Sequence, residues 1–472
     1  MTLRRIDSRF LLPHPVRRAV VLPGIDGWSE ELARLGVEPG SDGSEPLDLV
    51  VAPVDRAGEA AALRPRAAIL EGRGRRRLAG LRERAYLPLP AHGEPLVYVP
   101  HGAPGPARYA FATWAYADSP WKRLRNRAVG ELAAHHLLPP IRPEVIVGSR
   151  PAQPFVVQGA LELGMPDDVE PLLLAGQGDD YSRGAFLLFE RGASEPSWAL
   201  KFQRLPVPVL TFELEARGLS LAAEAGGAIA AHAPRWLGGD ETEGLRWTLE
   251  TAAPGRPLLA NLRSSGSDGA VGRVCRWLLE VGRTTLAPPA ALGEERRRLL
   301  EEVLPEWGLG SDLVEALDGV PAVLLHNDVG SWNIVVDGDD FTVLDWEDCV
   351  RHGLPLWDLL YFLADSAAHL DGITDPAERG PHFERLFLGE APSSKLLFEW
   401  VRHMVGALAL PEAAVGPIAT LCWLHHGLSG DRRAASTSDA SSKGHVAHTM
   451  FRDFGERWRR HPGLGPSWAC WR

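Results

Sequence analysis

A short β-hairpin predicted in the C-terminal half of the chain constrains the fold more than any other feature. Residues 324–363 read LLHNDVGSWNIVVDGDDFTVLDWEDCVRHGLPLWDLLYFL. Two apolar runs, residues 334–336 and 341–344, flank the turn-forming residues 337–340, and this pattern predicts two antiparallel strands. In a hairpin, the start of the first strand lies next to the end of the second strand. The polar residues before and after the hairpin are therefore expected to lie side by side.

Three oxygen-bearing side chains stand at that open end, namely Asp328, Asn333 and Asp345. With His326 the first two spell HxDxxxxN, and Asp345 opens the sequence DWED. Phosphoryl transfer needs one carboxylate beside the acceptor hydroxyl, and an amide oxygen and a second carboxylate around Mg²⁺. Asp is also common in turns and at helix caps, which gives each motif an ordinary structural explanation. Asn occurs only four times in the chain, so its presence at the required position favours the catalytic interpretation.

These motifs resemble those of the aminoglycoside phosphotransferase and choline kinase family, whose members are relatives of the protein kinases. The resemblance implies an α+β, two-lobed, protein-kinase-like fold, with ATP and Mg²⁺ bound between the lobes. It also implies that Asp328 is a catalytic residue and that Asn333 and Asp345 are metal ligands.

Two further residues of this region are expected to give structural support. His326 would hold the loop by hydrogen bonds. Asp358 would cap the helix that starts in GLPLWDLLYFL and would brace the catalytic loop. Asn327 departs from the resemblance, because the family usually has Gly at this position, and this difference is expected to affect the backbone of the loop.

A lysine on an upstream strand is the second requirement, because the phosphates of ATP need a cation. Lys occurs only four times, and Lys201 lies in the alternating segment WALKFQR, which predicts a strand. The resemblance therefore assigns Lys201 to catalysis and to the ATP phosphates. Its carboxylate partner is expected in FELEARGLSLAAEAGG, where Glu215 fits the family best and Glu213 and Glu224 remain alternatives.

Two other segments are expected to contact the nucleotide. The sequence AGQGDDYSRGAFLLF predicts a hairpin whose tip covers the phosphates, with Gly178 and Ser182 as contacts. The segment LETAAPGRPL looks like the connection between the two lobes, and backbone groups from Glu250 to Ala252 would bind the adenine edge. The sequence leaves ATP and GTP both open.

Composition narrows the class of protein. The 472 residues carry 50 basic and 61 acidic side chains, a net charge of −11, which argues against a general nucleic-acid binder. The four cysteines are far apart and form no CxxC pair, which suits a reduced, cytoplasmic location. Prolines interrupt both the N-terminal segment and the most apolar stretch, residues 404–424, so neither a signal peptide nor a membrane span is expected.

The chain is expected to contain three parts. Residues 1–140 alternate strands and a helix and resemble a Rossmann-like or methyltransferase-like α/β accessory domain that ends in a helical connector. Residues 150–253 would form the kinase-like N-lobe, and residues 254–472 the helical C-lobe. The basic residues 122–127 suggest either an interaction surface or, more commonly, a solvated helix face. The Ser-rich residues 427–443 suggest a mobile loop.

The sequence as a whole predicts an ATP-dependent phosphotransferase that moves the γ-phosphoryl group to a hydroxyl of a small molecule, such as an aminoglycoside, a sugar or a choline-like acceptor. Two alternatives remain: a nucleotide-binding pseudokinase with a regulatory role, and an enzyme that transfers AMP. The expected partners are ATP, Mg²⁺ and the small-molecule acceptor. The oligomeric state is not specified by the sequence.

Overall fold

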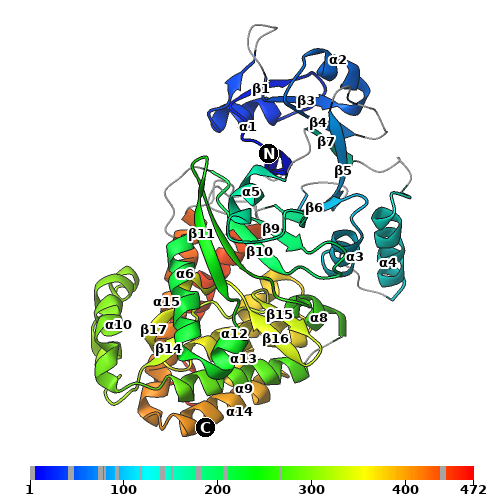
Figure 1. The fold of residues 1–472 in the computed structure, drawn as a ribbon. Coiled ribbons are helices and arrows are strands. Elements are labelled where there is room, and N and C mark those ends of the chain that lie inside the picture. The colour runs from blue at the N-terminus through cyan, green and yellow to red at the C-terminus, as the bar shows by residue number, and fades with distance from the viewer. Residues whose placement is uncertain are drawn as a thin grey trace. The chain divides into compact units, whose positions relative to one another are not determined.

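The computed structural model describes most of the chain, as two compact units. The described residues are 6–40, 47–72, 78, 81–90, 95–115, 120–138, 144–149, 153–175, 183–205, 211–265, 268–435 and 443–472. The first unit comprises Met1–Val209 and Trp236–Ala253, and the second comprises Leu210–Arg235 and Pro254–Arg472. A large sheet fills the first unit and helices dominate the second (Figure 1), so the predicted α+β fold class is confirmed.

The first unit is built on one twelve-stranded sheet with the strand order β11-β12-β10-β9-β8-β6-β5-β7-β4-β3-β1-β2. The strands are β1 (Arg18–Val21), β2 (Glu38–Pro39), β3 (Leu49–Pro53), β4 (Ala67–Gly72), β5 (Arg82–Leu89), β6 (Val97–Pro100), β7 (Glu144–Ser149), β8 (Glu170–Leu174), β9 (Gly184–Phe189), β10 (Trp198–Phe202), β11 (Trp236–Thr242) and β12 (Leu245–Thr251). The helices are α1 (Trp28–Arg34), α2 (Ala57–Ala62), α3 (Pro104–Thr113), α4 (Pro120–Ala134) and α5 (Phe155–Leu161), with the short 3-10 segments η1 (Ile6–Leu11) and η2 (Val54–Arg56).

Only one end of this sheet is parallel. Strands β1, β3 and β4 pair in parallel, as their apolar sequences predict, because strands covered on both faces read as continuous apolar runs. Strand β7 then pairs antiparallel with β4, and the sheet continues antiparallel through β5, β6 and β8. The Rossmann-like character expected for residues 1–140 is therefore not confirmed.

Contacts also cross the expected boundary at residues 140–150. The side chain of Asp7 in η1 forms a buried ion pair with Arg204, just after β10, with 2.8 Å between Asp7 Oδ2 and Arg204 Nε. One hydrophobic core runs from Phe10 through the parallel strands to Trp247 and Leu249 in β12. The N-terminal strands and the predicted N-lobe strands thus form one compact unit, and the finer division into domains stays a prediction.

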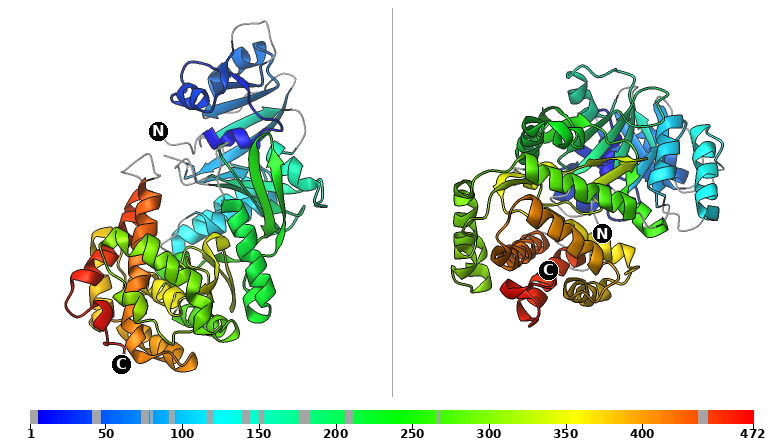
Figure 2. Two further views of the ribbon diagram at one scale, coloured as in Figure 1. Left: turned by 90° about the vertical axis from the view of Figure 1, so that its left-hand side faces the viewer. Right: turned by 90° about the horizontal axis from the view of Figure 1, so that it is seen from below.

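The second unit is mostly helical and carries two small sheets (Figure 2). Its helices are α6 (Thr211–Ala225), α7 (Gly227–Ala231), α8 (Leu258–Ser265), α9 (Asp268–Thr284), α10 (Gly293–Arg298), α11 (Asp312–Glu315), α12 (Trp357–Leu370), α13 (Arg379–Leu388), α14 (Ser394–Ala407), α15 (Glu412–Ala435) and α16 (Lys443–Arg460). Short helical turns are η3 (Pro289–Leu292), η4 (Leu299–Val303), η5 (Pro305–Trp307), η6 (Trp346–Asp348), η7 (Pro376–Glu378) and η8 (Gly465–Ser467).

The predicted hairpin is present in the second unit. Strands β15 (Ile334–Asp337) and β16 (Asp340–Val343) pair antiparallel, and β13 (Arg256–Pro257) joins β15 to complete a three-stranded sheet. Strands β14 (Val323–Leu325) and β17 (Val350–Gly353) form the second sheet. Helix α12 is almost entirely buried, because its sequence is apolar on nearly every side.

One expectation from the sequence was wrong, and one strand was not anticipated. Residues 427–435, taken as part of a mobile Ser-rich loop, continue helix α15, which packs along α16. Strand β11 was not predicted, because Gly238 and Gly239 in its middle are unusual inside a strand. In the part of the chain that the structure describes, no helix is both long and apolar enough to span a bilayer.

Candidate active site

The carboxylate of Asp328 is held from two sides within the second unit. Asp328 lies in the loop between β14 and β15 and is buried. The Nδ2 atom of Asn333 donates to Asp328 Oδ2 over 2.9 Å, and the hydroxyl of Tyr361 donates to Asp328 Oδ1 over 2.9 Å. The side chain is thus fixed in orientation.

His326 ties the loop to the hairpin, as predicted. Its Nδ1 accepts from the backbone N–H of Asp328 over 3.2 Å, so its Nε2 is the protonated nitrogen and donates to the carbonyl oxygen of Leu344 over 3.0 Å. A single neutral tautomer satisfies both bonds. The ring is buried and meets the edge of Trp346 at a centroid distance of 4.7 Å. His326 therefore has a structural role: its ring links the backbone of the loop at Asp328 to the backbone of the hairpin at Leu344.

Asn327 adopts the backbone conformation that a glycine would adopt. Its φ angle is +67°, in the left-handed region, where Asn is among the few side chains tolerated. The side-chain Nδ2 donates to the carbonyl oxygen of Asp348 over 3.0 Å. Asn327 therefore has a φ angle that favours glycine, and its side chain adds a contact between the loop and η6.

Helix α12 holds the loop between β14 and β15 at three points spaced three and four residues apart. Asp358 accepts the backbone N–H groups of His326 and Asn327, each over 2.8 Å. Tyr361 donates to Asp328, one turn further along. Asp365 follows another turn later and accepts from Ser331 of the loop. This spacing places all three side chains on one face of the helix.

Asp358 braces the loop as predicted, but it does not cap the helix. The N-cap position of α12 is Leu356, and no side chain caps the helix there. Asp358 is fully enclosed, and this burial raises its pKa to about 6, although the two N–H bonds from the loop pull the pKa down. The carboxyl group therefore titrates close to neutral pH instead of well below it.

Asp365 is a bracing residue that the sequence did not reveal. Burial raises its pKa, but the bond and charge of His369, the charge of Arg379 and the bond from Ser331 outweigh burial, so the net pKa is lowered. The Arg379 Nη1 and His369 Nε2 atoms lie 3.4 and 3.5 Å from Asp365 Oδ1. Asp365 is therefore a buried carboxylate that its neighbours keep ionised beside the loop.

The hairpin places Asn333 beside Asp345. Ile334 pairs with Val343, and the N–H of Leu344 donates to the backbone carbonyl of Asn333 over 2.7 Å, so Asp345 follows directly after this bond. Asp345 has a φ angle of +70°, an uncommon conformation for a residue with a Cβ atom. The predicted approach of the two residues across the open end of the hairpin is confirmed.

The donor set at this point fits Mg²⁺. Both hydrogen bonds of the Asn333 side chain go from Nδ2 to Asp328, so its amide oxygen is the atom turned to another partner. Mg²⁺ is bound in proteins by one or two carboxylates together with waters and substrate phosphates. Within the ranges of the chain that the structure describes, no group of three or more His, Cys, Asp or Glu side chains is placed to hold a metal ion. A metal at this point would therefore take further ligands from water or from substrate phosphates. Asn333 and Asp345 suit a metal that arrives with a nucleotide.

Helix α6 packs tightly against the segment that follows Asp345. A Cβ atom on Gly218 would lie 1.9 Å from the carbonyl oxygen of Trp346, so only glycine allows this approach. Glu215, one turn earlier on α6, is completely buried, whereas Glu213 and Glu224 are exposed, and Glu224 pairs with Arg351. Of the three glutamates, Glu215 is the one whose side chain faces the protein interior.

Lys201 has a carboxylate partner in the first unit that the sequence did not predict. Its Nζ lies 3.0 Å from Glu250 Oε1, and Glu250 is only 2% exposed. Lys201 on β10 lies opposite Thr248 on β12, so Glu250 is its diagonal neighbour on the same face of the sheet. This pair could have been found only from the register of the two strands. The pairing of Lys201 with Glu215 stays a prediction.

The other residues predicted to contact the nucleotide lie either in the first unit or outside the described residues. Glu250 lies inside the sheet, opposite Ala199 on one side and Trp236 on the other. The N–H of Ala252 donates to the carbonyl oxygen of Ser197 over 3.0 Å. Contact of the adenine with the backbone of Glu250 or of Ala252 stays a prediction. Strands β8 and β9 form the expected hairpin, but Gly178 and Ser182 at its tip lie outside the described residues.

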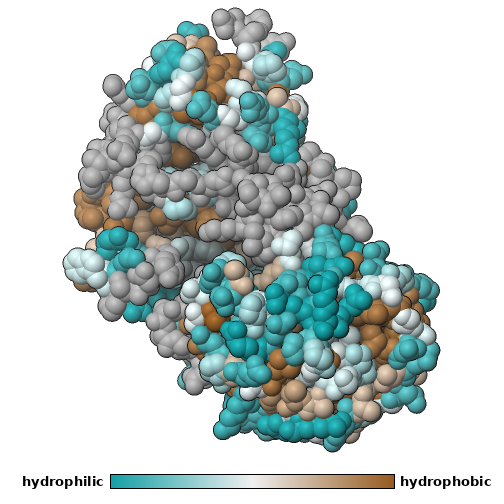
Figure 3. Space-filling view, turned by 180° about the vertical axis from the view of Figure 1, so that it is seen from behind, coloured by the Kyte–Doolittle hydropathy of each residue, from teal (hydrophilic) through white to brown (hydrophobic). Residues whose placement is uncertain are grey.

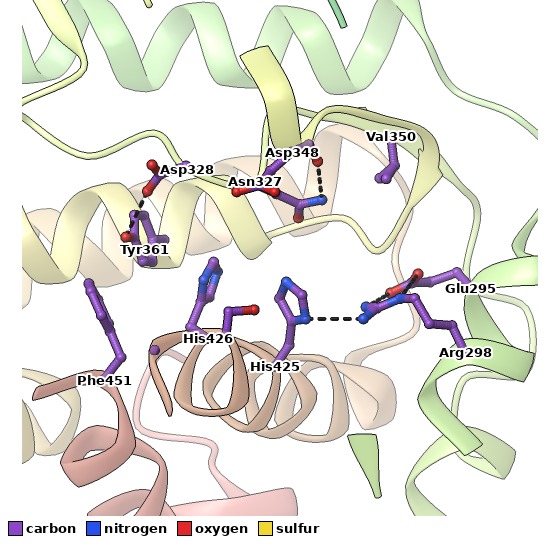
Figure 4. Close-up of a pocket in the computed structure, with 12 residues that line it drawn as sticks. Glu295, Arg298, Asn327, Asp328, Asp348, Val350, Tyr361, His425, His426 and Phe451 are labelled. Carbon is purple, nitrogen blue, oxygen red and sulfur yellow. Dashed lines mark hydrogen bonds and ion pairs between the residues drawn. The ribbon is translucent and has the colours of Figure 1, made fainter. Parts of the chain in front are cut away.

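A cavity of about 200 Å³ opens beside Asp328 within the second unit. Figure 4 shows Asp328 and Tyr361 at one end and Arg298 at the other, with the side chains of α15 along one wall. Its lining residues come from six segments of this unit: Glu295, Arg298, Asn327, Asp328, Asp348, Val350, Tyr361, His425, His426, Ser429, Gly430 and Phe451. The cavity is large enough for a small molecule.

The wall of this cavity alternates rings and charges. Tyr361 stacks on His426 and on Phe451 at centroid distances of 4.2 and 5.1 Å. At the far end Arg298 makes a two-point ion pair with Glu295, at 2.8 and 2.7 Å, and donates to His425 over 3.2 Å. The lining of the cavity is thus a mixture of flat rings and polar groups.

Comparison with known proteins supports the class of enzyme that the sequence indicates. Residues 182–393 match the model of the phosphotransferase enzyme family. This segment contains Lys201, the catalytic loop, the hairpin and helix α12. The match supports a small-molecule phosphotransferase, and it leaves the particular acceptor undetermined. No curated protein matches the chain.

Solved structures with similarity to the chain include three kinases of small molecules. A glucosamine kinase in complex with glucosamine, ADP and inorganic phosphate is 15% identical, with 67% of this chain and 85% of that chain covered and a TM-score of 0.33. A Plasmodium vivax ethanolamine kinase is 13% identical, with coverages of 61% and 82% and a TM-score of 0.33. A type VIII aminoglycoside-3'-phosphotransferase is 17% identical, with coverages of 63% and 97% and a TM-score of 0.30. These similarities are too low to assign a substrate.

Proposed function

We propose that the protein transfers the γ-phosphoryl group of ATP to a hydroxyl group of a small molecule. The observation that carries the proposal is the position of the Asp328 carboxylate, which is oriented by Asn333 and Tyr361 at the wall of a cavity. In a phosphotransferase the acceptor hydroxyl must be held in line with the phosphorus atom, and positioning contributes more than basicity. A rigidly held carboxylate beside an acceptor-sized cavity suits that task.

The reaction requires little covalent chemistry from the protein. The acceptor hydroxyl donates its proton to Asp328 late in the reaction, while its oxygen forms a bond to the γ-phosphorus and the bond from that phosphorus to the leaving oxygen of ADP breaks. The tether from Tyr361 keeps Asp328 from rotating away from the acceptor. The products are the phosphorylated acceptor and ADP.

Asn333 and Asp345 are the residues that would hold Mg²⁺. When bound, this ion would neutralise charge on the phosphates. Lys201 would contact the phosphates from β10, and its ion pair with Glu250 fixes the ammonium group in the first unit. The cavity next to Asp328 would take the acceptor.

Labelled nucleotides separate this proposal from its two alternatives. The protein is incubated with Mg²⁺, a pool of small metabolites and ATP that is labelled either at the γ or at the α phosphorus. Label that moves from the γ position to a small molecule supports the proposal. Label from the α position on an acceptor indicates AMP transfer, and bound nucleotide without any transfer indicates a regulatory pseudokinase.

A further inference from the structure

Helix α4 of the first unit exposes an apolar stripe that no described residue covers. The structure has twelve exposed large hydrophobic side chains among its described residues, and five of them fall between residues 114 and 137. They are Trp114, Trp121, Leu124, Leu132 and Leu137. Trp121 is 74% exposed and Leu124 57%, values that are unusual for a Trp and a Leu in a folded domain.

The positions of these residues make a continuous face. Trp121, Leu124, Ala128 and Leu132 recur at intervals of three and four residues, so they lie along one side of α4. The opposite side of the helix packs on α3 through Gly130 and Ala133. The helix therefore carries two apolar faces, of which one is buried in the domain and the other is presented outward.

Positive charge gathers on the same turns of α4 as Trp121 and Leu124, and Arg125 and Glu131 are the charged residues next to the stripe. Lys122, Arg123, Arg125 and Arg127 lie within one and a half turns of helix, in a chain whose net charge is −11. Among the described residues no carboxylate forms an ion pair with Arg123, Arg125 or Arg127. Along the edge of the first unit that α4 forms, hydrophobic and hydrophilic surface lie side by side (Figure 3).

We propose that α4 docks the protein on an anionic membrane surface. A helix with exposed Trp and Leu on one face and an excess of cations on the same turns suits the boundary between lipid headgroups and acyl chains, where acidic headgroups attract the cations. A second copy of the chain is a poor partner, because two such faces would bring like charges together. Leucines along the stripe also distinguish it from a surface for nucleic acid, which would use stacking aromatic rings.

Vesicle co-sedimentation of the full chain tests the proposal. We expect binding to vesicles of phosphatidylcholine with phosphatidylserine, no binding to phosphatidylcholine alone, and at least about a tenfold loss of binding at high salt. The double variant Trp121→Ser/Leu124→Ser should lose binding by about tenfold or more. The matched variant Leu163→Ser, which changes an exposed leucine far from α4 in sequence, should bind like the unmodified protein.

Three outcomes would overturn the proposal. The first is absence of binding to the anionic vesicles. The second is binding that the Trp121→Ser/Leu124→Ser change leaves intact. The third is displacement of the protein from vesicles by single-stranded DNA that it binds as tightly as it binds the vesicles. Both altered side chains are solvent-exposed, so far-ultraviolet circular dichroism and thermal unfolding of the variants should match those of the unmodified protein. This inference does not depend on the proposed enzymatic function.

Discussion

The hydroxyl of Tyr361 donates to Asp328 Oδ1 over 2.9 Å, from a helix that lies 33 positions further along the chain. The ring of Tyr361 is itself held by stacking on His426 and Phe451. The orientation of the proposed catalytic carboxylate therefore depends on the packing between α12, α15 and α16, and not only on its own loop.

Removal of this hydroxyl should impair turnover. The change Tyr361→Phe keeps the stacked ring and leaves one oxygen of a buried carboxylate without its donor, which costs about 1–3 kcal/mol. If that cost falls on the transition state, kcat decreases by about 10- to 100-fold. The matched change Tyr109→Phe, in the first unit, should leave kcat unchanged. An unaltered kcat in Tyr361→Phe would show that Asp328 does not need this tether.

The left-handed backbone of Asn327 predicts an order of stability among its variants. Asn327→Gly should fold normally, because glycine adopts positive φ angles freely. Asn327→Val should be less stable than Asn327→Gly by about 1–2 kcal/mol, because its branched Cβ clashes in this conformation. Chemical denaturation of the two variants measures the difference. Equal free energies of unfolding would contradict the conformation described for this loop.

The raised pKa of Asp358 predicts a pH dependence of stability with an unusual sign. The unfolded chain ionises Asp358 near pH 4 and the folded chain near pH 6, so the folded state retains the proton between these values. The stabilising contribution of this group is therefore complete below about pH 4 and is lost as the pH rises through 6, by up to about 3 kcal/mol. The measurement is the free energy of unfolding from pH 4 to 7, compared with that of Asp358→Asn. An equal pH dependence in the two proteins would contradict the raised pKa.

The rate of phosphoryl transfer should depend on pH in the opposite direction to the free energy of unfolding. The ionised carboxylate accepts both N–H groups of His326 and Asn327, whereas a protonated one is a poor acceptor at its hydroxyl oxygen. The rate of transfer should therefore fall as the pH drops through about 6. A pH–rate profile of kcat checks this prediction. A rate that stays constant from pH 7 to 5 would show that the brace does not require ionisation.

Asp345 gives a prediction for nucleotide binding. The change Asp345→Ala removes one of the two proposed metal ligands, so the affinity for ATP in the presence of Mg²⁺ should fall by about tenfold or more. Affinity measured in the absence of Mg²⁺ should change little. The control Asp339→Ala removes an exposed carboxylate at the turn of the same hairpin and should leave both affinities unaltered. Equal loss with and without Mg²⁺ would point to a structural role for Asp345.

Local patterns in the sequence were sufficient to predict the elements that carry the site. The two apolar runs on either side of the turn predicted the hairpin, and the hairpin in turn brought Asn333 and Asp345 together. The spacing of Asp358, Tyr361 and Asp365 on α12 was also visible, but only the first of these was recognised. The spacing shows that three side chains share one face of the helix. Which segment that face contacts is known only when the packing of the helix is known.

Contacts set by long-range packing could not be predicted. The pair of Lys201 and Glu250 depends on the register between β10 and β12, which no motif specifies. The parallel strands at the N-terminus were correctly predicted, yet their continuation into an antiparallel sheet through β7 was not. In both cases the missing information lay in strand pairing and not in local propensity.

The most direct test of the proposed mechanism is transfer of label from γ-labelled ATP by the unmodified protein and by Asp328→Asn, with ATP affinity measured in parallel. We predict that the unmodified protein labels a small hydroxyl compound, and that Asp328→Asn lowers the rate by about a thousandfold or more while ATP affinity stays within about threefold. Transfer by Asp328→Asn at the unmodified rate would contradict the central claim.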